Sequence, residues 1–140
     1  MREGYSGTPL GKKLGVRTGQ QTWRLGMPDG VAVEIAEWGE RPELLASPEV
    51  GLDHAHVFST ERSLLEDWLP RLYDLLAPDG MVWVSWPMKA SKVETDITED
   101  SVREIALPVG FVDVKVCAVD KVWSGLKLVI RKENRPGRTP

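Results

Sequence analysis

The sequence has a single cysteine, Cys117, and no long apolar run among its 140 residues. One thiol cannot close a disulfide within the chain, which excludes a disulfide-stapled scaffold and favours a reducing compartment. Uncharged runs such as Met81–Met88 fall far short of the roughly 20 apolar residues that a membrane-spanning helix needs. The opening residues, MREGYSGTPL, also lack the apolar stretch of a secretory signal. We therefore expect a cytoplasmic chain without a membrane partner.

A strong net charge is also missing. There are 18 Lys and Arg side chains against 21 Asp and Glu, so the formal charge is −3 and no overall field attracts a polyanion. A basic patch does gather near the C-terminus, at Arg131, Lys132, Arg135 and Arg138, but no aromatic side chains alternate with it to stack on bases. The composition thus disfavours nucleic acid and leaves a small molecule or a protein as the expected partner.

The sequence does have the composition of an ordinary globular protein, with 41% hydrophobic and 28% charged residues. A chain of this length buries roughly two thirds of its unfolded surface, which is enough for one core. We expect a single α/β domain over residues 1–132. Residues 133–140 are polar and contain two prolines and a glycine, which predicts a disordered tail.

The first third of the chain alternates short helical and extended patterns. Thr8 is the expected N-cap of a short helix that Gly15 ends, and Gln21–Leu25 is the expected first strand. Residues 31–38 fit a strand by their alternation and a helix by their spacing, and we favour a helix that begins at Asp29.

From residue 39 onward the pattern becomes clearer. Residues 39–51 contain several glycine and proline breaks and are expected to form a loop that holds at most a short helix or strand. Leu52–Phe58 is a predicted strand, and a helix with a 3.6-residue apolar period opens after Ser59-Thr60-Glu61. Pro78-Asp79-Gly80 then predicts a turn into Met81–Trp86, an apolar run of the kind that is buried in a parallel sheet.

The remaining elements are a helix and a hairpin. Thr98 is the expected cap of a helix over Glu99–Val109. Strands are predicted over residues 111–119 and 126–132, joined by a short connection at 120–125. The full order predicts the fold class α/β: a three-layer, Rossmann-like sandwich whose mostly parallel sheet ends in an antiparallel hairpin.

The segment Leu75–Val84, LLAPDGMVWV, resembles the later half of class I methyltransferases. In that family a long helix, a proline-acid-glycine turn and a buried strand precede one more helix and a terminal hairpin. The likeness covers about residues 16–132. It implies a methyltransferase-like topology.

Further segments are similar to a small bacterial family of unknown function, domain-of-unknown-function family 3052. This second resemblance implies no activity. The segments are GYSGTPL at 4–10, WPMKAS at 86–91, TDITED at 95–100, KVCAVD at 115–120 and WSGL at 123–126.

The glycine-rich loop of methyltransferases is missing. Enzymes of that family resemble other nucleotide binders in placing a G-x-G type of loop after the first strand, where bare backbone approaches the ligand. In the corresponding run Leu25–Gly30, Met27 and Pro28 fill positions that should be bare, and the proline has no N–H to donate. We therefore expect no bound S-adenosylmethionine and no other cofactor. Three acidic side chains are open alternatives for holding a ribose: Glu34, Glu37 and Glu40.

His54 and His56 are two residues apart on a predicted strand, so they face the same side and could reach one metal ion. A metal site needs at least one further ligand, and we expect two hydrogen-bonded buried histidines instead. Cys117 lies in mid-strand, where a thiol behaves as a small hydrophobe unless a base activates it. We expect neither a metal site nor a catalytic residue.

The best candidate site is the carboxyl edge of the sheet, where open α/β folds bind ligands. In the resembled topology the last strand inserts beside Met81–Trp86, which brings the 120–125 turn near the loop after Trp86. Alternatively, the tryptophans brace these loops and the charged side chains pair at the surface. Nine side chains would surround the cleft: Ser85, Trp86, Lys89, Thr95, Asp96, Asp120, Lys121, Trp123 and Ser124.

The favoured hypothesis is a non-catalytic Rossmann-like domain that binds a small ligand or a protein partner at this edge. The alternative is an enzyme, either a divergent S-adenosylmethionine-dependent methyltransferase or another transferase with a nucleotide-like ligand. Fold analogy supports the place of a site and not its chemistry.

Overall fold

The computed structural model describes residues 7–135, which build a six-stranded sheet with the order β2-β1-β3-β4-β6-β5. Strands β1 to β4 run parallel to one another, whereas β6 runs antiparallel to both of its neighbours. The predicted mostly parallel sheet that ends in a hairpin is confirmed. The strands are β1 (Gln21–Leu25), β2 (Glu43–Leu44), β3 (Leu52–Phe58), β4 (Leu76–Pro87), β5 (Phe111–Ala118) and β6 (Trp123–Ile130).

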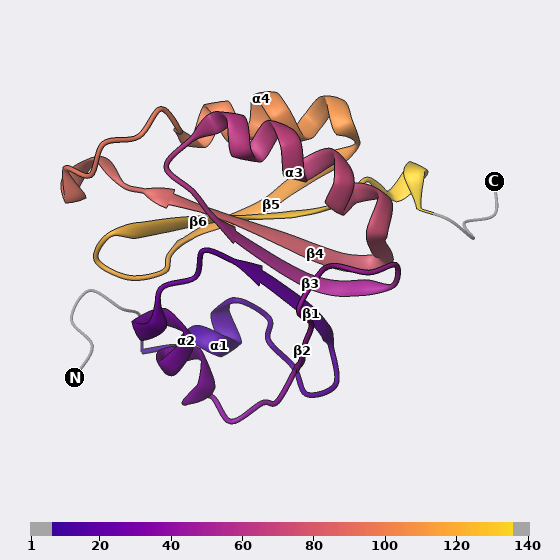
Figure 1. Ribbon diagram of the computed structural model, residues 1–140, viewed down its shortest axis with the longest axis horizontal. Helices are drawn as coiled ribbons and strands as arrows, with labels where there is room; N and C mark the ends of the chain where they lie inside the picture. The colour runs from indigo at the N-terminus through magenta and orange to yellow at the C-terminus, as the bar shows by residue number, and fades with distance from the viewer. Residues whose placement is uncertain (1–6, 136–140) are drawn as a thin grey trace.

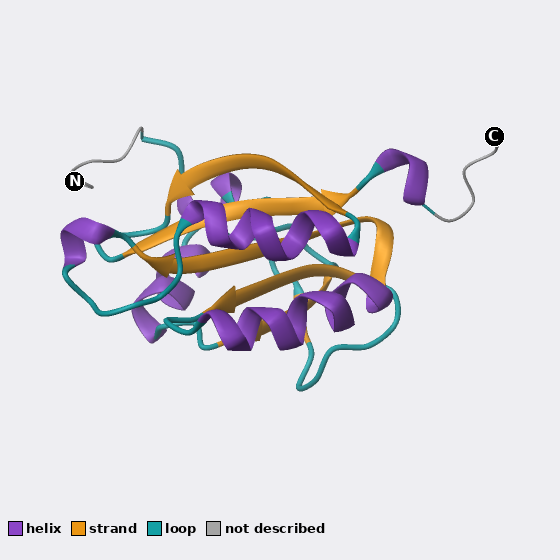
Figure 2. Cartoon of the chain, turned by 90° about the horizontal axis from the view of Figure 1, so that it is seen from above, coloured by secondary structure: helices purple, strands orange, loops and turns teal. Residues whose placement is uncertain are grey.

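Helices cover both faces of the sheet, which makes the predicted three layers (Figure 1). On one face lie α1 (Leu10–Lys13) and α2 (Asp29–Ala36), the latter confirming the helix favoured for the ambiguous stretch. On the other face α3 (Arg62–Leu75) and α4 (Glu99–Val109) lie side by side (Figure 2). Two short 3-10 helices, η1 (Lys89–Ser91) and η2 (Lys132–Asn134), follow β4 and β6.

Two apolar cores sit on the two faces because successive side chains of a strand point to opposite sides. On the α3/α4 face, Val82, Val84 and Trp86 of β4 are buried among leucines of α3. On the α1/α2 face, Trp83 is fully buried, and its Nε1–H donates to the carbonyl oxygen of Leu14 at 2.9 Å. That bond anchors the end of α1 to the middle of the sheet.

Two of the expected boundaries near the helices are wrong. Thr8 is not the N-cap of α1; the cap is Pro9, whose extended backbone leads into a helix that begins at Leu10. Pro78-Asp79-Gly80 does not precede β4 as a separate turn. Strand β4 already begins at Leu76, and a register shift opposite β3 accommodates the extra residues as an irregularity within the strand.

The terminal hairpin is tighter than expected. Strand β6 begins at Trp123 rather than Leu126, because Asp120 Oδ1 accepts hydrogen bonds from the backbone N–H groups of Val122 at 2.8 Å and Trp123 at 2.7 Å. Within the expected loop at 39–51 lies the two-residue strand β2, in agreement with the expectation of at most a short helix or strand there.

Among residues 7–135, no helix combines the length and the apolar character that crossing a bilayer requires. Of the expected disordered tail, residues 133 and 134 belong to η2, and residues 136–140 lie outside the described part of the chain. Residues 4–6 of the first resembled segment also lie outside it.

Candidate functional site

The strand order reverses between β1 and β3, and open α/β folds bind ligands in the crevice outside such a switch point. Here the chain leaving β1 packs directly against the end of β3. Gly26 has a left-handed φ of 71°, and a Cβ built on it would lie 2.9 Å from the carbonyl oxygen of Phe58. The absence of a side chain at Gly26 thus serves contact between two backbone segments.

The residues after Gly26 continue this packing. Met27 is partly buried against the α1/α2 core, to which Phe58 also belongs. Pro28 is the N-cap of α2 and supplies no N–H, while Asp29 places a carboxylate in the first turn of the helix. A negative charge at a helix N-terminus uses the favourable end of the helix dipole and disfavours a second anion there.

Replacing Gly26 by Ala should lower the free energy of unfolding by about 2 kcal/mol, since the left-handed backbone is strained for alanine and the Phe58 carbonyl leaves no room for its methyl group. Urea unfolding measures the change. Gly30→Ala is the matched control, because a Cβ there meets nothing within 4 Å and alanine is the better helix former. Equal stability of the two variants would contradict tight packing at the switch point.

A hollow of about 480 Å³ opens at the carboxyl end of β4, and we call it the β4 hollow. Its wall includes Trp86, which is 6% exposed, and Ile97, which is 2% exposed. The rest of the wall comes from the segment between β4 and α4, from the start of α4 and from β6. The lining residues are Trp86, Pro87, Met88, Lys89, Lys92, Val93, Glu94, Thr95, Ile97, Thr98, Glu99 and Ser124.

The segment that walls the β4 hollow is fixed at both ends. At its start, the Met88 N–H donates to the carbonyl oxygen of Val122 in the hairpin turn at 2.8 Å. At its end, Thr95 Oγ1 donates to the carbonyl oxygen of Thr60 at 2.7 Å. These two hydrogen bonds tie the segment to the hairpin turn and to the residues that precede α3.

Lys92 has an unusual backbone conformation. It is the only non-glycine residue with positive φ, 60°, in the part of the chain that the structure describes. A left-handed conformation costs roughly 1–2 kcal/mol for a residue with a side chain, and such strain is concentrated at functional sites. This strained residue lines the β4 hollow.

The charges around the β4 hollow are unevenly paired. Glu99 forms an ion pair with Arg103, which also pairs with Asp113 at 2.9 Å. These hydrogen bonds raise the pKa of Arg103, and Arg103 lowers the pKa of Asp113. Lys89 and Lys92, by contrast, make no ion pair with any residue between 7 and 135, and neither does Glu94. Two cations beside a tryptophan suit an anion with an apolar body.

The structure brings together four of the nine predicted site residues. Trp86, Lys89, Thr95 and Ser124 line the β4 hollow. Ser85 and Trp123 do not, because alternation along the strands sends them to the opposite face. There, Ser85 Oγ hydrogen-bonds to His56 Nε2 at 2.7 Å, and the ring of Trp123 packs on Phe58 with centroids 5.2 Å apart.

The other three predicted residues lie in turns and outside the lining. Asp96 Oδ1 accepts the Arg62 N–H at 2.7 Å and so satisfies the first turn of α3. Asp120 closes the hairpin turn, and Lys121 is exposed in it. The single cleft that we expected is thus divided by the sheet. Asp96 and Asp120 accept backbone N–H groups in turns, and neither forms the surface ion pair that the bracing alternative expected among residues 7–135.

Sequence reasoning missed Lys92, Glu94 and Glu99 as lining residues. Thr98 was expected only as a cap, which it is: its Oγ1 accepts the Ser101 N–H at 3.1 Å. The position of the Thr98 cap could have identified them. A helix that begins after a loop at the carboxyl edge of the sheet has its first turn at that edge, so residues next to the cap are expected to line a site there.

The two histidines are buried and neutral. His54 Nε2 donates to the carbonyl oxygen of Leu14 at 2.8 Å, and His56 bonds to Ser85. Burial, as the largest cause, lowers the pKa of His54 to about 4 and that of His56 well below its usual range. The expected structural role fits this geometry, and residues 7–135 hold no cluster of three metal-ligating side chains.

Cys117 does not have the surroundings of a reactive thiol. It is partly buried, and burial raises its pKa although Lys13 and Lys115 act in the opposite direction. A raised pKa keeps the sulfur protonated and weakly nucleophilic. The geometry agrees with the expected packing role.

Comparison with known proteins identifies the fold. The sequence matches no known family model and no curated protein. Among solved structures, this chain is similar to an S-adenosylmethionine-dependent methyltransferase from Aquifex aeolicus, with 15% identity over 86% of this chain and 87% of that one and a TM-score of 0.62.

Two further solved structures are similar to this chain at slightly lower identities and TM-scores. A ribosomal protein L11 methylase from Lactobacillus delbrueckii subsp. bulgaricus has 13% identity, covers 87% of this chain and 76% of its own, and has a TM-score of 0.55. A TehB-like S-adenosylmethionine-dependent methyltransferase from Corynebacterium glutamicum has 9% identity, and the match covers 91% of this chain and 90% of that one, with a TM-score of 0.53. The fold is therefore the methyltransferase-like Rossmann fold that the sequence predicted.

Proposed function

We propose that this chain is a small-molecule-binding domain of methyltransferase-like fold, and that its ligand occupies the β4 hollow without transfer of a methyl group. The observation that carries the proposal is a contrast between two places on one sheet edge. At the switch point, Gly26 packs on the backbone of β3, whereas the β4 hollow is partly apolar and open, and its wall is tied by hydrogen bonds at both ends. A ligand site needs an open, partly apolar hollow of this kind rather than tightly packed backbone.

The side chains suggest the class of ligand. Trp86 and Ile97 offer an apolar wall, and Ser124 offers a hydroxyl group. The two unpaired lysines outnumber the one unpaired carboxylate of the lining, Glu94, and favour negative charge. Such a set fits a small organic anion, for example an aromatic or aliphatic carboxylate. We expect Lys89 and Lys92 to hold its charged group and Trp86 to contact its apolar part.

A second candidate, a divergent S-adenosylmethionine-dependent methyltransferase, is supported by the comparisons. The similar structures include proteins whose names state that activity, and they favour this candidate over a non-catalytic domain. The packing at Gly26 favours the first candidate. Calorimetric titration with S-adenosylmethionine separates them: micromolar binding that is weakened by Gly26→Ala would support the methyltransferase and overturn our first proposal.

Lys92→Gly should remove ligand binding without loss of stability, since it deletes a cation and relieves a strained backbone. We expect an unfolding free energy equal to the parent's or up to about 1 kcal/mol higher. A thermal-shift screen of small organic anions provides the probes, because selective binding to the folded state raises its stability. The shift should disappear in Lys92→Gly.

The matched control is Lys121→Gly, which removes an equally exposed lysine from the neighbouring hairpin turn, outside the β4 hollow. Its thermal shift should equal that of the parent. A screen with no stabilising anion, or a shift lost equally in both variants, would contradict a ligand site in the β4 hollow.

A further inference from the structure

A second hollow lies on the other helical layer, away from both places discussed above. It has a volume of about 270 Å³ and is formed by α1, by the residues that precede β1 and by the segment that follows α2. It shares no lining residue with the β4 hollow. We call it the α1 hollow, and it is lined by Lys12, Gly15, Val16, Arg17, Trp38 and Glu40.

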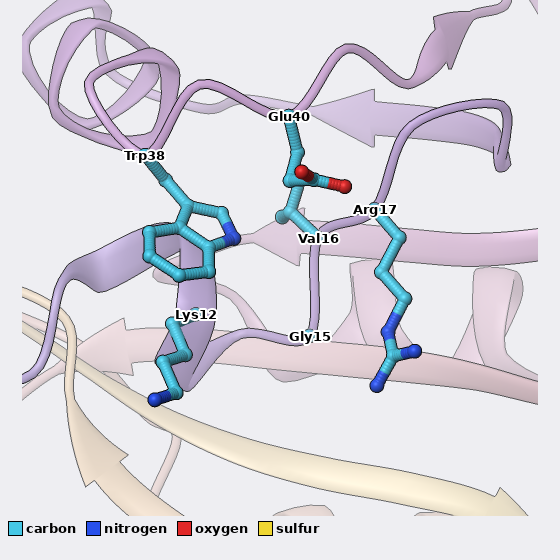
Figure 3. A pocket seen from close by; sticks show the side chains of 6 residues that line it. All are labelled: Lys12, Gly15, Val16, Arg17, Trp38 and Glu40. Carbon is cyan, nitrogen blue, oxygen red and sulfur yellow. The ribbon is translucent and has the colours of Figure 1, made fainter.

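We propose that the α1 hollow binds a nucleoside monophosphate whose base carries an exocyclic amino group. In this arrangement the base stacks on Trp38, Glu40 accepts the amino N–H, and Lys12 and Arg17 hold the phosphate. Figure 3 shows an indole, a carboxylate and two cationic side chains around one space. The indole of Trp38 lies on one side and the guanidinium of Arg17 on the other.

The stacking surface is fixed by its packing. Trp38 is 36% exposed although it is pressed against α1, where a Cβ on Gly11 would lie 2.6 Å from the Cβ of Trp38. Only glycine at position 11 allows this approach, so the indole is held in place while part of it remains open. Stacking of a base on such a ring contributes roughly 1–3 kcal/mol to binding.

The loops on either side of the hollow are tied to each other. The Thr18 N–H donates to Glu40 Oε1 at 2.9 Å, the Arg41 N–H donates to Thr18 Oγ1 at 2.9 Å, and the Gly19 N–H donates to the Arg41 carbonyl at 3.1 Å. One oxygen of Glu40 is therefore fixed in the protein. Its other oxygen has no hydrogen bond to residues 7–135 and is free to accept one from a ligand.

The cations of the hollow are not neutralised by the protein. Neither Lys12 nor Arg17 forms an ion pair within the described residues, and Lys12 Nζ lies 6.0 Å from the centre of the Trp38 ring, at the limit of a cation–π contact. The arginines of α3 and α4, by contrast, are paired with carboxylates. Arginine and lysine are the usual protein partners of a phosphate group.

Titration calorimetry with adenosine 5′-monophosphate tests the proposal at low ionic strength. We expect saturable binding with a dissociation constant below 1 mM, and weakening of about tenfold in Arg17→Gln, since a charged phosphate contact is worth about 1.4 kcal/mol. Adenosine and inorganic phosphate should each bind more weakly, because each lacks one half of the contacts. Lys121→Gln, at an exposed hairpin-turn lysine that lines neither hollow, is the matched control and should bind as the parent does.

The role of Glu40 has its own test. Inosine 5′-monophosphate carries an oxygen in place of the amino group, so the parent should prefer the adenosine nucleotide. Glu40→Gln keeps an oxygen for the Thr18 N–H and presents an amide N–H to the base, so the preference should fall or reverse.

Three results would overturn the proposal: no saturable binding at millimolar nucleotide, equal affinity for inorganic phosphate, or a loss in Lys121→Gln as large as in Arg17→Gln. None of them depends on the β4 hollow having a ligand, so the two proposals stand or fall separately.

Discussion

Lowering the pH from 7 to 4.5 should reduce the free energy of unfolding by about 2 kcal/mol through His54 alone. This residue is buried on β3 with a pKa of about 4 against an ordinary value of 6.5, and burial is the main cause. The unfolded chain takes up a proton on this side chain below pH 6.5, whereas the folded chain does so only near pH 4. Stability therefore falls as the pH drops through this window and is unaffected by His54 above it.

His56 adds to the same loss. Its pKa is lowered in the same direction by burial, with repulsion from His54 and Arg24 as smaller causes. Urea unfolding at a series of pH values measures the combined slope, which should be close to two protons per molecule between pH 6 and 5, beyond what the surface carboxylates contribute.

The control for this prediction is His54→Phe, which keeps a ring of similar size. The Leu14 carbonyl still accepts the Nε1–H of Trp83 at 2.9 Å, so no backbone acceptor is left without a partner. The variant should lose about half of the excess acid sensitivity between pH 6 and 5. An unchanged pH slope in His54→Phe would show that His54 is not the source of the effect.

Trp86→Ala should lower the free energy of unfolding by about 3–5 kcal/mol, the range for removing a large aromatic side chain from a core. Trp86 is 6% exposed and belongs to the same apolar cluster as Val82, Leu126 and the leucines of α3. It also lines the β4 hollow, so one side chain both stabilises the fold and forms part of the proposed site. Guanidinium chloride unfolding measures the change.

Two further variants separate these roles of Trp86. Trp123→Ala, on the opposite face and only partly buried, should cost less, at about 2 kcal/mol. Trp86→Phe keeps an aromatic wall and should retain ligand-induced stabilisation at a lower melting temperature. A loss below about 1 kcal/mol in Trp86→Ala would contradict its place in the core.

The sequence predicted the fold class and most elements because these depend on local patterns. The 3.6-residue period of α3, the apolar run of β4 and the cap at Thr98 are properties of neighbouring residues, and the structure confirms all three. Where local signals competed, the errors were small. Pro78-Asp79-Gly80 predicts a turn in isolation, but pairing of β4 with β3 draws these residues into an irregular strand.

The candidate site could be predicted only in part. The carboxyl edge of β4 followed from the fold, and Trp86, Lys89, Thr95 and Ser124 were identified correctly as neighbours. Grouping Ser85 and Trp123 with them was wrong, since proximity along the chain does not say on which face of a sheet a side chain lies. Of the residues that line the α1 hollow, only Glu40 was a candidate from the sequence, as one alternative for holding a ribose. The hollow itself could not be predicted, because its residues come from three segments that only tertiary packing brings together.

The sequence by itself determined the three-layer α/β arrangement of this protein and the absence of a bare glycine loop after the first strand, because both depend on residue types and their spacing. Only the tertiary structure decided what that first loop does. Gly26 packs on the Phe58 carbonyl, and hollows form instead at the end of β4 and beside α1. Contacts between residues distant in sequence depend on the sum of many weak packing interactions, and no local pattern encodes that sum.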